Sequence, residues 1–99
     1  MEKKLDISVI SPVFNELENL ETFVESVTAV MNSTNMIWEL IIVDDGSNDG
    51  SSKILKKIGH QENIRSILLS KNYGQTTAIQ AGFDNAVGEY FVTLDSDLQ

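Results

Sequence analysis

Residues 38–50, WELIIVDDGSNDG, join an apolar run to a short polar segment that is dense in carboxylates and glycines. The run WELIIV is β-branched and apolar, as buried strands are. The polar segment fits the calcium-loop template in part, because Asp45, Ser47 and Asp49 fall on its first three side-chain ligand positions. The last ligand position should be a glutamate and is Lys56, and such a loop follows a helix rather than a strand. The stretch therefore predicts a strand with a polar turn, and calcium is a poor candidate for its ligand.

Strand-like and helix-like segments alternate along the chain. Besides WELIIV, the strand-like segments are ISVISPVF (7–14), IRSILLS (64–70) and YFVTLD (90–95). The helix-like segments are the stretch behind Asn15 up to residues 32–35, SSKILKKIG (51–59) with Gly59 as its stop, and QTTAIQAGFDNAVG (75–88).

The first helix-like segment follows Asn15, a suitable N-cap residue. Apolar residues recur behind it at spacings of three and four, which marks one apolar face of a helix. These residues are Leu17, Leu20, Phe23, Val24, Val27, Val30 and Met31. In the last helix we expect small residues to allow close packing against the sheet. They are Ala78, Ala81, Gly82 and Ala86.

The alternation predicts an α/β fold with an open, parallel, Rossmann-like sheet built from right-handed strand–helix–strand crossovers. Ligands of such sheets bind outside the carboxyl ends of the strands. We expect one rim at this edge to hold Glu16, Asp44, Asp45, Lys71, Asn72, Asp95 and Asp97. Clustered acids repel one another unless a cation or the hydrogen-bond donors of a ligand offset the repulsion, which makes the rim a candidate site. Taken singly, each acidic turn is equally well explained as ordinary turn and helix-capping chemistry.

Composition limits the partners. The formal net charge is -8 and the pI is about 4.3, which argues against nucleic acid or an anionic membrane as a direct partner. A phosphate-bearing ligand would need a cation or backbone amides. The absence of cysteine excludes disulfides and thiolate metal sites. No run of about 18 apolar residues occurs, and residues 1–8 lack the apolar core of a signal peptide, so we expect a cytoplasmic stretch.

Three blocks of the sequence resemble, in order and spacing, the N-terminal half of family 2 glycosyltransferases with the GT-A fold. They are SPVFNE (11–16), IIVDDGSNDGS (41–51) and LSKNYGQTTAIQAGFDNAVGEYFVTLDSDLQ (69–99). Within that family the third block is most similar to polyprenyl-phosphate glycosyltransferases. Two departures are visible: Phe14 stands where the family usually has Tyr, and Ser96 where Ala is usual. The resemblance implies that residues 1–99 are the nucleotide-sugar-binding half of a transferase domain, truncated at its C-terminus.

The resemblance also implies roles for the rim. Asp45 would hydrogen-bond the base of a UDP- or GDP-sugar, and a carboxylate suits the imide N–H of uracil because it only accepts hydrogen bonds. The residues lining the same pocket would be Pro12, Phe14, Glu16 and Asp44.

At the diphosphate end, the resemblance makes Asp97 the principal ligand of Mg²⁺ or Mn²⁺, with Asp95 and Gln99 beside it. These are hard oxygen ligands that suit such cations. The metal would stabilise charge on the leaving nucleoside diphosphate, so Asp95 and Asp97 are the expected catalytic residues. Lys71 would add a second positive charge near the phosphates.

The acceptor contacts of inverting members lie beyond DSDLQ (95–99), so we expect the 99-residue chain alone to be inactive. The expected acceptor is a polyprenyl phosphate, or another glycan or lipid, bound through the missing half, with the full-length protein at the cytoplasmic face of the membrane. The last strand would lack a covering neighbour, which predicts self-association.

Three alternatives remain open at this stage. A receiver domain also places paired acids at a strand end, but after its first strand. A phosphatase of the haloacid-dehalogenase type uses an Asp-x-Asp motif with Mg²⁺, but near the start of its domain. The third alternative is a degenerate nucleotide-binding domain without catalysis.

Overall fold

The structure is a computed structural model that describes residues 5–58, 61 and 63–94. Its elements follow one another as β1 (Ile7–Val13), α1 (Leu20–Asn32), β2 (Trp38–Asp44), α2 (Ser51–Ile58), β3 (Ile64–Leu68), α3 (Gln75–Asn85) and β4 (Tyr90–Thr93). The strands form one sheet in the order β3-β2-β1-β4, and every neighbouring pair is parallel. The predicted α/β fold with an open parallel sheet is therefore confirmed.

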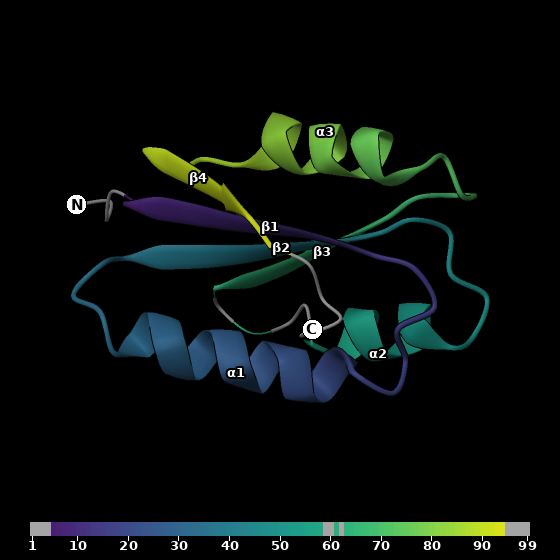
Figure 1. The fold of residues 1–99 in the computed structure, drawn as a ribbon, viewed down its shortest axis with the longest axis horizontal. Helices are drawn as coiled ribbons and strands as arrows, with labels where there is room; N and C mark the ends of the chain where they lie inside the picture. The colour runs from purple at the N-terminus through teal and green to yellow at the C-terminus, as the bar shows by residue number, and fades with distance from the viewer. Residues whose placement is uncertain (1–4, 59–60, 62, 95–99) are drawn as a thin grey trace.

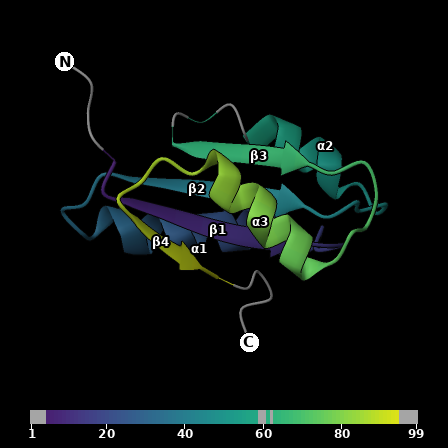
Figure 2. The same cartoon turned by 90° about the horizontal axis from the view of Figure 1, so that it is seen from above.

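The strand order explains the layers. The chain moves outward from β1 to β2 and β3, then crosses back to place β4 on the other side of β1. Crossovers of one hand then put helices on opposite faces when the direction reverses. Accordingly, α1 and α2 lie on one face of the sheet and α3 on the other (Figure 1). Seen from above, α3 runs across β1 and β2 (Figure 2), and it contacts both strands.

Two apolar clusters fill the space between these layers. The cluster under α1 and α2 contains Val9, Val13, Leu20, Phe23, Val24, Val27, Met31, Trp38, Leu40, Ile42, Leu55 and Ile64. The cluster under α3 contains Ile10, Ile41, Val43 and Ala78, with Ala81 and Ala86 packed against it. Every residue of β2 is buried, as its mostly apolar sequence predicts for a strand covered on both faces.

The small residues of α3 let the helix approach the sheet closely, as predicted. A Cβ added at Gly82 would lie 2.4 Å from Cγ2 of Ile10 on β1. A larger side chain at this position would push the helix away from the strand.

The start of the first helix was predicted wrongly. The helix begins at Leu20, with Asn19 at the N-cap position, and Asn15 lies outside it with a positive φ of 53°. Leu17 therefore does not belong to the apolar face and is 38% exposed. Val30 is also exposed, because it lies in the last turn at the margin of the apolar stripe.

The edge strand β4 carries an exposed apolar surface. Tyr90, Phe91 and Val92 are all exposed, and the Phe91 ring meets Phe83 of α3 edge-on at 5.5 Å between centroids. The predicted exposed apolar edge is thus present. Among the described residues, no helix has the length and apolar character needed to cross a bilayer.

Candidate functional site

The carboxyl ends of β1, β2 and β3 bring the described residues of the predicted rim to one edge of the sheet. The reversal of chain direction lies between β1 and β4, which is where ligands of open α/β sheets bind. Residues 14–19 leave β1 at this edge, 45–50 leave β2 and 69–74 leave β3. The backbone N–H of Leu94, directly after β4, donates to the carbonyl of Ile10 in the middle of β1 at 3.0 Å.

Asp44 ends β2 and is buried among hydroxyl groups. Its Oδ1 accepts the backbone N–H of Ser47 at 3.2 Å and also the Ser47 hydroxyl. Its Oδ2 accepts the hydroxyl of Ser52, on α2, at 2.8 Å. The carboxylate thus closes the turn and ties it to the helix that follows.

Asp45 turns to the other face and holds the loop before α3. The backbone N–H of Tyr73 donates to Oδ1 at 2.8 Å and that of Gly74 to Oδ2 at 3.0 Å. The Asn72 side-chain amide donates to the Asp45 carbonyl at 3.2 Å. A carboxylate at the first amides of a helix is favourable because these N–H groups have no partner within the helix.

The same two loops are in backbone contact at Gly46. This residue has a φ of 75°, and a Cβ there would lie 2.3 Å from the carbonyl carbon of Lys71. A glycine is required on both counts.

Asn15 joins the loops after β1 and β2. Its backbone N–H donates to the Ser47 hydroxyl at 2.8 Å, and its side-chain oxygen accepts the N–H of Asn48 at 2.9 Å. The left-handed conformation of Asn15, which Asn tolerates better than most residues, allows both bonds. The sequence predicted Asn15 to cap a helix. In the structure the same residue instead links the loops after β1 and β2.

Asp49 forms a second link between these loops and caps α2. It accepts the backbone N–H of Leu17 at 3.1 Å, and both the N–H and the hydroxyl of Ser51. The hydroxyl bond from Ser51 is the main cause that holds the pKa of Asp49 below its ordinary value of 3.8. Desolvation opposes this shift, and the backbone bonds add to it.

These contacts correct one expectation about the acids. The structure supplies hydrogen-bond donors for Asp44, Asp45 and Asp49 from its own hydroxyl and amide groups. No cation or ligand is needed to account for their proximity. Serines placed two to eight residues after Asp44 and Asp49 were the sequence signal for part of this arrangement, and it was missed.

The remaining predicted residues lie around the opening of the rim. Phe14 is 45% exposed, Pro12 is partly buried, and Glu16 accepts the side-chain amide of Asn19 at 3.0 Å. A hollow of about 240 Å³ is lined by Asn15, Glu16, Leu17, Glu18, Asn19 and Asp49. Lys71 is exposed, with its Nζ 5.3 Å above the Tyr73 ring.

The predicted metal ligands Asp95, Asp97 and Gln99 lie outside the described residues. Within residues 5–58, 61 and 63–94, no group of three His, Cys, Asp or Glu side chains is placed to hold a metal ion. Asp44 and Asp45 each accept hydrogen bonds from the protein at both carboxylate oxygens.

Comparison with known proteins assigns the family. A family model described as glycosyl transferase family 2 matches residues 8–99. The chain belongs to glycosyl transferase family 2. The predicted family is thereby confirmed, and it replaces the receiver and phosphatase alternatives.

Relatives and solved structures of the family agree. The chain is 45% identical over 96 residues to the undecaprenyl-phosphate 4-deoxy-4-formamido-L-arabinose transferase of Pectobacterium atrosepticum, covering 95% of this chain and 29% of the relative. It is 43% identical over 95 residues to the transferase of the same name from Salmonella enteritidis, covering 94% of this chain and 29% of the relative. The chain thus spans less than a third of these relatives.

Solved structures confirm the predicted GT-A arrangement. S. aureus TarS in complex with UDP-GlcNAc superposes with a TM-score of 0.78 at 25% identity, covering 94% of this chain and 27% of that one. The mannosyltransferase PcManGT from Pyrobaculum calidifontis, in complex with GDP-Man and Mn²⁺, superposes with a TM-score of 0.79 at 21% identity. The match covers 96% of this chain and 28% of PcManGT, and at this identity it is evidence for a shared fold only.

Proposed function

We propose that residues 1–99 supply the donor-binding half of an inverting glycosyltransferase that moves a sugar from a nucleoside diphosphate to a polyprenyl phosphate. The observation that carries this proposal is the 45% identity to a transferase named for undecaprenyl phosphate over nearly the whole chain. The rim at the carboxyl ends of β1 and β2 supports it, because open α/β sheets bind ligands there.

The base of the donor is proposed to bind between the loops after β1 and β2. Phe14 offers an exposed ring for stacking. Asp45 already accepts two backbone N–H groups, but an ionised carboxylate has about four lone-pair sites and can accept a further imide N–H. Pro12, Glu16 and Asp44 would complete this pocket. S. aureus TarS, which is known in complex with UDP and with UDP-GlcNAc, supports a uracil nucleotide as the first candidate.

The diphosphate end is proposed to use Mg²⁺ or Mn²⁺. The ligands would come from Asp95, Asp97 and Gln99, which offer the hard oxygens that such cations prefer. A bound cation stabilises negative charge on a leaving diphosphate. The exposed Lys71 is proposed to add positive charge beside it.

The acceptor is proposed to bind in the part of the full-length protein that this chain lacks. A phosphate monoester has a second pKa of about 6 and is already anionic at neutral pH, so a polyprenyl phosphate needs no strong general base to attack the sugar. Such a lipid resides in a membrane, and we place the full-length protein at its cytoplasmic face. Other glycan or lipid acceptors fit the same donor site. The 99-residue chain alone should transfer no sugar.

Titration calorimetry of the 99-residue chain tests the donor site. UDP, GDP and ADP are each titrated with Mn²⁺ and with EDTA. We expect weak binding that needs the metal, strongest for UDP, because a negative rim repels a free diphosphate.

Asp97→Asn should abolish the metal dependence. Asp84→Asn is the matched control, because Asp84 is an exposed acid on α3 that bonds only to Gln80 among the interactions described. Equal binding in EDTA and Mn²⁺, or none at all, would support a degenerate domain without catalysis.

A further inference from the structure

Asn15 has an unusual backbone conformation at the point where the chain leaves β1. Its φ is 53°, and among the described residues it is the only non-glycine residue with a positive φ. This left-handed conformation is unfavourable for most L-residues, although Asn tolerates it better than most. A residue kept in such a conformation is held there by its surroundings, and such residues cluster at functional sites. Asn15 lies between Phe14 and Glu16, which are both proposed to line the base pocket.

The loop after β2 supplies the bonds that hold this conformation. The backbone N–H of Asn15 donates to the Ser47 hydroxyl at 2.8 Å, and the backbone N–H of Asn48 donates to the Asn15 side-chain oxygen at 2.9 Å. Two residues further on, the backbone N–H of Leu17 donates to the Asp49 carboxylate at 3.1 Å. We call these three bonds the loop clamp, because they join residues 15–17 to residues 47–49.

The loop clamp connects the two sides of the proposed base pocket. On the side of β2, Asp45 is fixed by its own contacts, because its backbone N–H donates to the carbonyl of Val13 at 2.8 Å and its carboxylate accepts the N–H of Tyr73. On the side of β1, Phe14 is 45% exposed. The rotamers open to an exposed ring depend on the backbone that carries it. The direction of the Phe14 ring therefore depends on the conformation of its neighbour, Asn15.

We infer that Asn15 and Ser47 are positioning residues, which act through the loop clamp to hold the Phe14 ring in the direction that stacks on the donor's base. The inference rests on the proposed binding of the base between the loops after β1 and β2. Neither Asn15 nor Ser47 has to touch the donor for this role. A loop that is already ordered before the donor binds lowers the ordering cost of binding and so raises the affinity for the base.

The test measures the affinity of full-length variants for uridine, which carries the base but no phosphate. Asn15→Gly accepts the positive φ and removes only the side-chain bond to Asn48. We expect it to bind uridine about two- to tenfold more weakly, the size expected when one further side chain must be ordered on binding. Ser47→Ala removes the other bond of Asn15 and should act in the same direction. Because Ser47 also donates to Asp44, the Asn15 variants carry the main comparison.

Conservative variants should restore the affinity. Asn15→Asp keeps an oxygen that accepts the N–H of Asn48 and tolerates the same φ, and its added charge does not repel the uncharged uridine. Ser47→Thr keeps the hydroxyl group. Asn48→Ala is the matched control, because it removes an exposed side chain from the same loop while the backbone N–H that bonds Asn15 remains.

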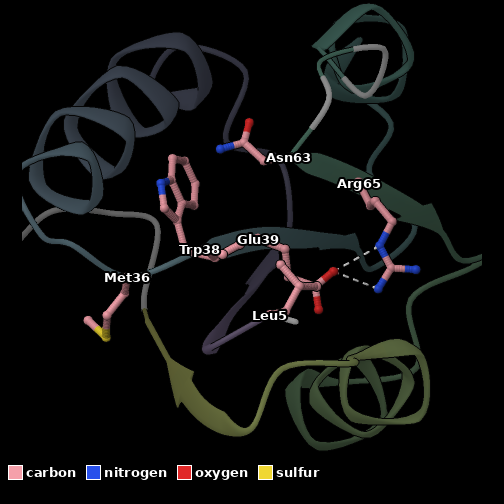
Figure 3. A pocket seen from close by; sticks show the side chains of 7 residues that line it. Leu5, Met36, Trp38, Glu39, Asn63 and Arg65 are labelled. Carbon is pink, nitrogen blue, oxygen red and sulfur yellow. Dashed lines mark hydrogen bonds and ion pairs between the residues drawn. The ribbon is translucent and has the colours of Figure 1, made fainter. Parts of the chain in front are cut away.

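A control for stability alone lies at the other end of β2 from the rim. Glu39, near the start of this strand, is 4% exposed and lies beside a pocket of about 470 Å³ (Figure 3). The Arg65 guanidinium on β3 donates to its Oε1 from Nη2 at 2.8 Å and from Nε at 3.1 Å. Arg65→Lys keeps the positive charge but cannot reproduce both bonds, so it should lower the melting temperature and leave the uridine affinity unchanged.

A double-mutant cycle tests whether Asn15 acts through Phe14. Phe14→Leu keeps an apolar side chain but loses the ring, so it should weaken uridine binding by itself. With no ring left to direct, Asn15→Gly should then weaken binding by less than about twofold further. Equal losses with and without the ring would show that Asn15 does not act through Phe14.

The outcomes separate this inference from the proposed function. If Asn15→Gly lowers the melting temperature but binds uridine as Asn48→Ala and Arg65→Lys do, the loop clamp is merely structural and the inference is overturned. Equal losses in the two arms of the cycle overturn it as well, and so does an unchanged affinity in Phe14→Leu. If the unmodified protein binds UDP with Mn²⁺ but not uridine, the base contact fails and the inference falls with it. Binding of neither ligand contradicts the proposed function as a whole.

Discussion

Asp45, directly after β2, accepts the backbone N–H of Gly74 through Oδ2 at 3.0 Å, so the loop after β2 holds the N-cap residue of α3. The neighbouring N–H of Tyr73 donates to Oδ1 of the same carboxylate. The proposed base contact and the loop before α3 therefore depend on one side chain.

Replacing Asp45 should change stability and nucleotide binding together. Asp45→Ala leaves two amide groups without their charged partner, and we expect the free energy of unfolding to fall by about 1–3 kcal/mol. The affinity for UDP should also fall, whereas the affinity for Mn²⁺ should stay nearly intact because the metal is proposed to bind elsewhere. Urea denaturation and titration calorimetry measure the two effects.

The control is Asp84→Ala, on the exposed side of α3, which should change the free energy of unfolding by less than about 0.5 kcal/mol. An unchanged UDP affinity in folded Asp45→Ala would contradict the base contact.

The close approach at Gly46 gives a second prediction. Gly46→Ala places a Cβ 2.3 Å from Lys71 and forces an L-residue into a φ of 75°. We expect a loss of unfolding free energy on the order of 3 kcal/mol, from the clash and the backbone strain together. Gly74→Ala separates the two causes, because Gly74 has a φ of 106° but a Cβ added there would meet no neighbour within 4 Å. Equal denaturation midpoints for the two variants would show that the loop contact is loose.

The sheet could be predicted from sequence because each strand carries a local pattern. WELIIV is apolar except for Glu39 and is buried throughout, and alternation of strand and helix is typical of a parallel sheet. The start of α1 could not be predicted in the same way. Asn15 has the chemistry of a helix cap, but its partners are Ser47 and Asn48, more than thirty residues away. Only the packed loops bring these partners within reach.

The sequence predicted which edge of the sheet holds the site, but it did not predict the hydrogen bonds within the site. Asp44 and Asp45 follow the apolar run of β2, so they lie at its carboxyl end. Their hydrogen-bond donors come from three other places, namely the loop after β2, helix α2 and the loop before α3. Glu39 was missed although its signal was present, since a charged residue inside an apolar strand requires a partner. The positively charged partner of Glu39 depends on the strand order, which places Arg65 on the neighbouring strand β3.

The lowered pKa of Asp49 predicts a pH dependence of stability. A carboxyl group whose pKa is lower in the folded state stabilises the fold above its unfolded pKa, near 3.8, and loses this contribution as pH falls through the folded value. We therefore expect Asp49→Asn to lower stability at pH 7 and to flatten the decline of stability below pH 3.8. Ser51→Ala should act in the same direction, because the Ser51 hydroxyl is the main cause of the shift. Urea denaturation between pH 7 and strongly acidic pH measures both. Parallel curves for the original and Asp49→Asn proteins would rule the contribution out.

The exposed edge at β4 predicts self-association of the purified 99-residue chain. The N–H groups of Tyr90 and Leu94 donate to the carbonyls of Asp6 and Ile10, so alternation along the strand directs those of Phe91 and Thr93 outward. An edge strand with free N–H groups and apolar side chains is a template for pairing with another chain. We expect sedimentation velocity to show a mass that rises with concentration.

Thr93→Pro identifies the surface responsible. It removes one outward N–H group and leaves the bonds to β1 in place, so it should shift the chain toward monomer. Thr93→Val is the control, because it keeps the N–H group and nearly the same shape. If both variants associate as the original does, the contact uses the apolar face around Phe83 and Phe91 rather than the strand edge. A strictly monomeric original chain at high concentration would show that neither surface is sufficient for association.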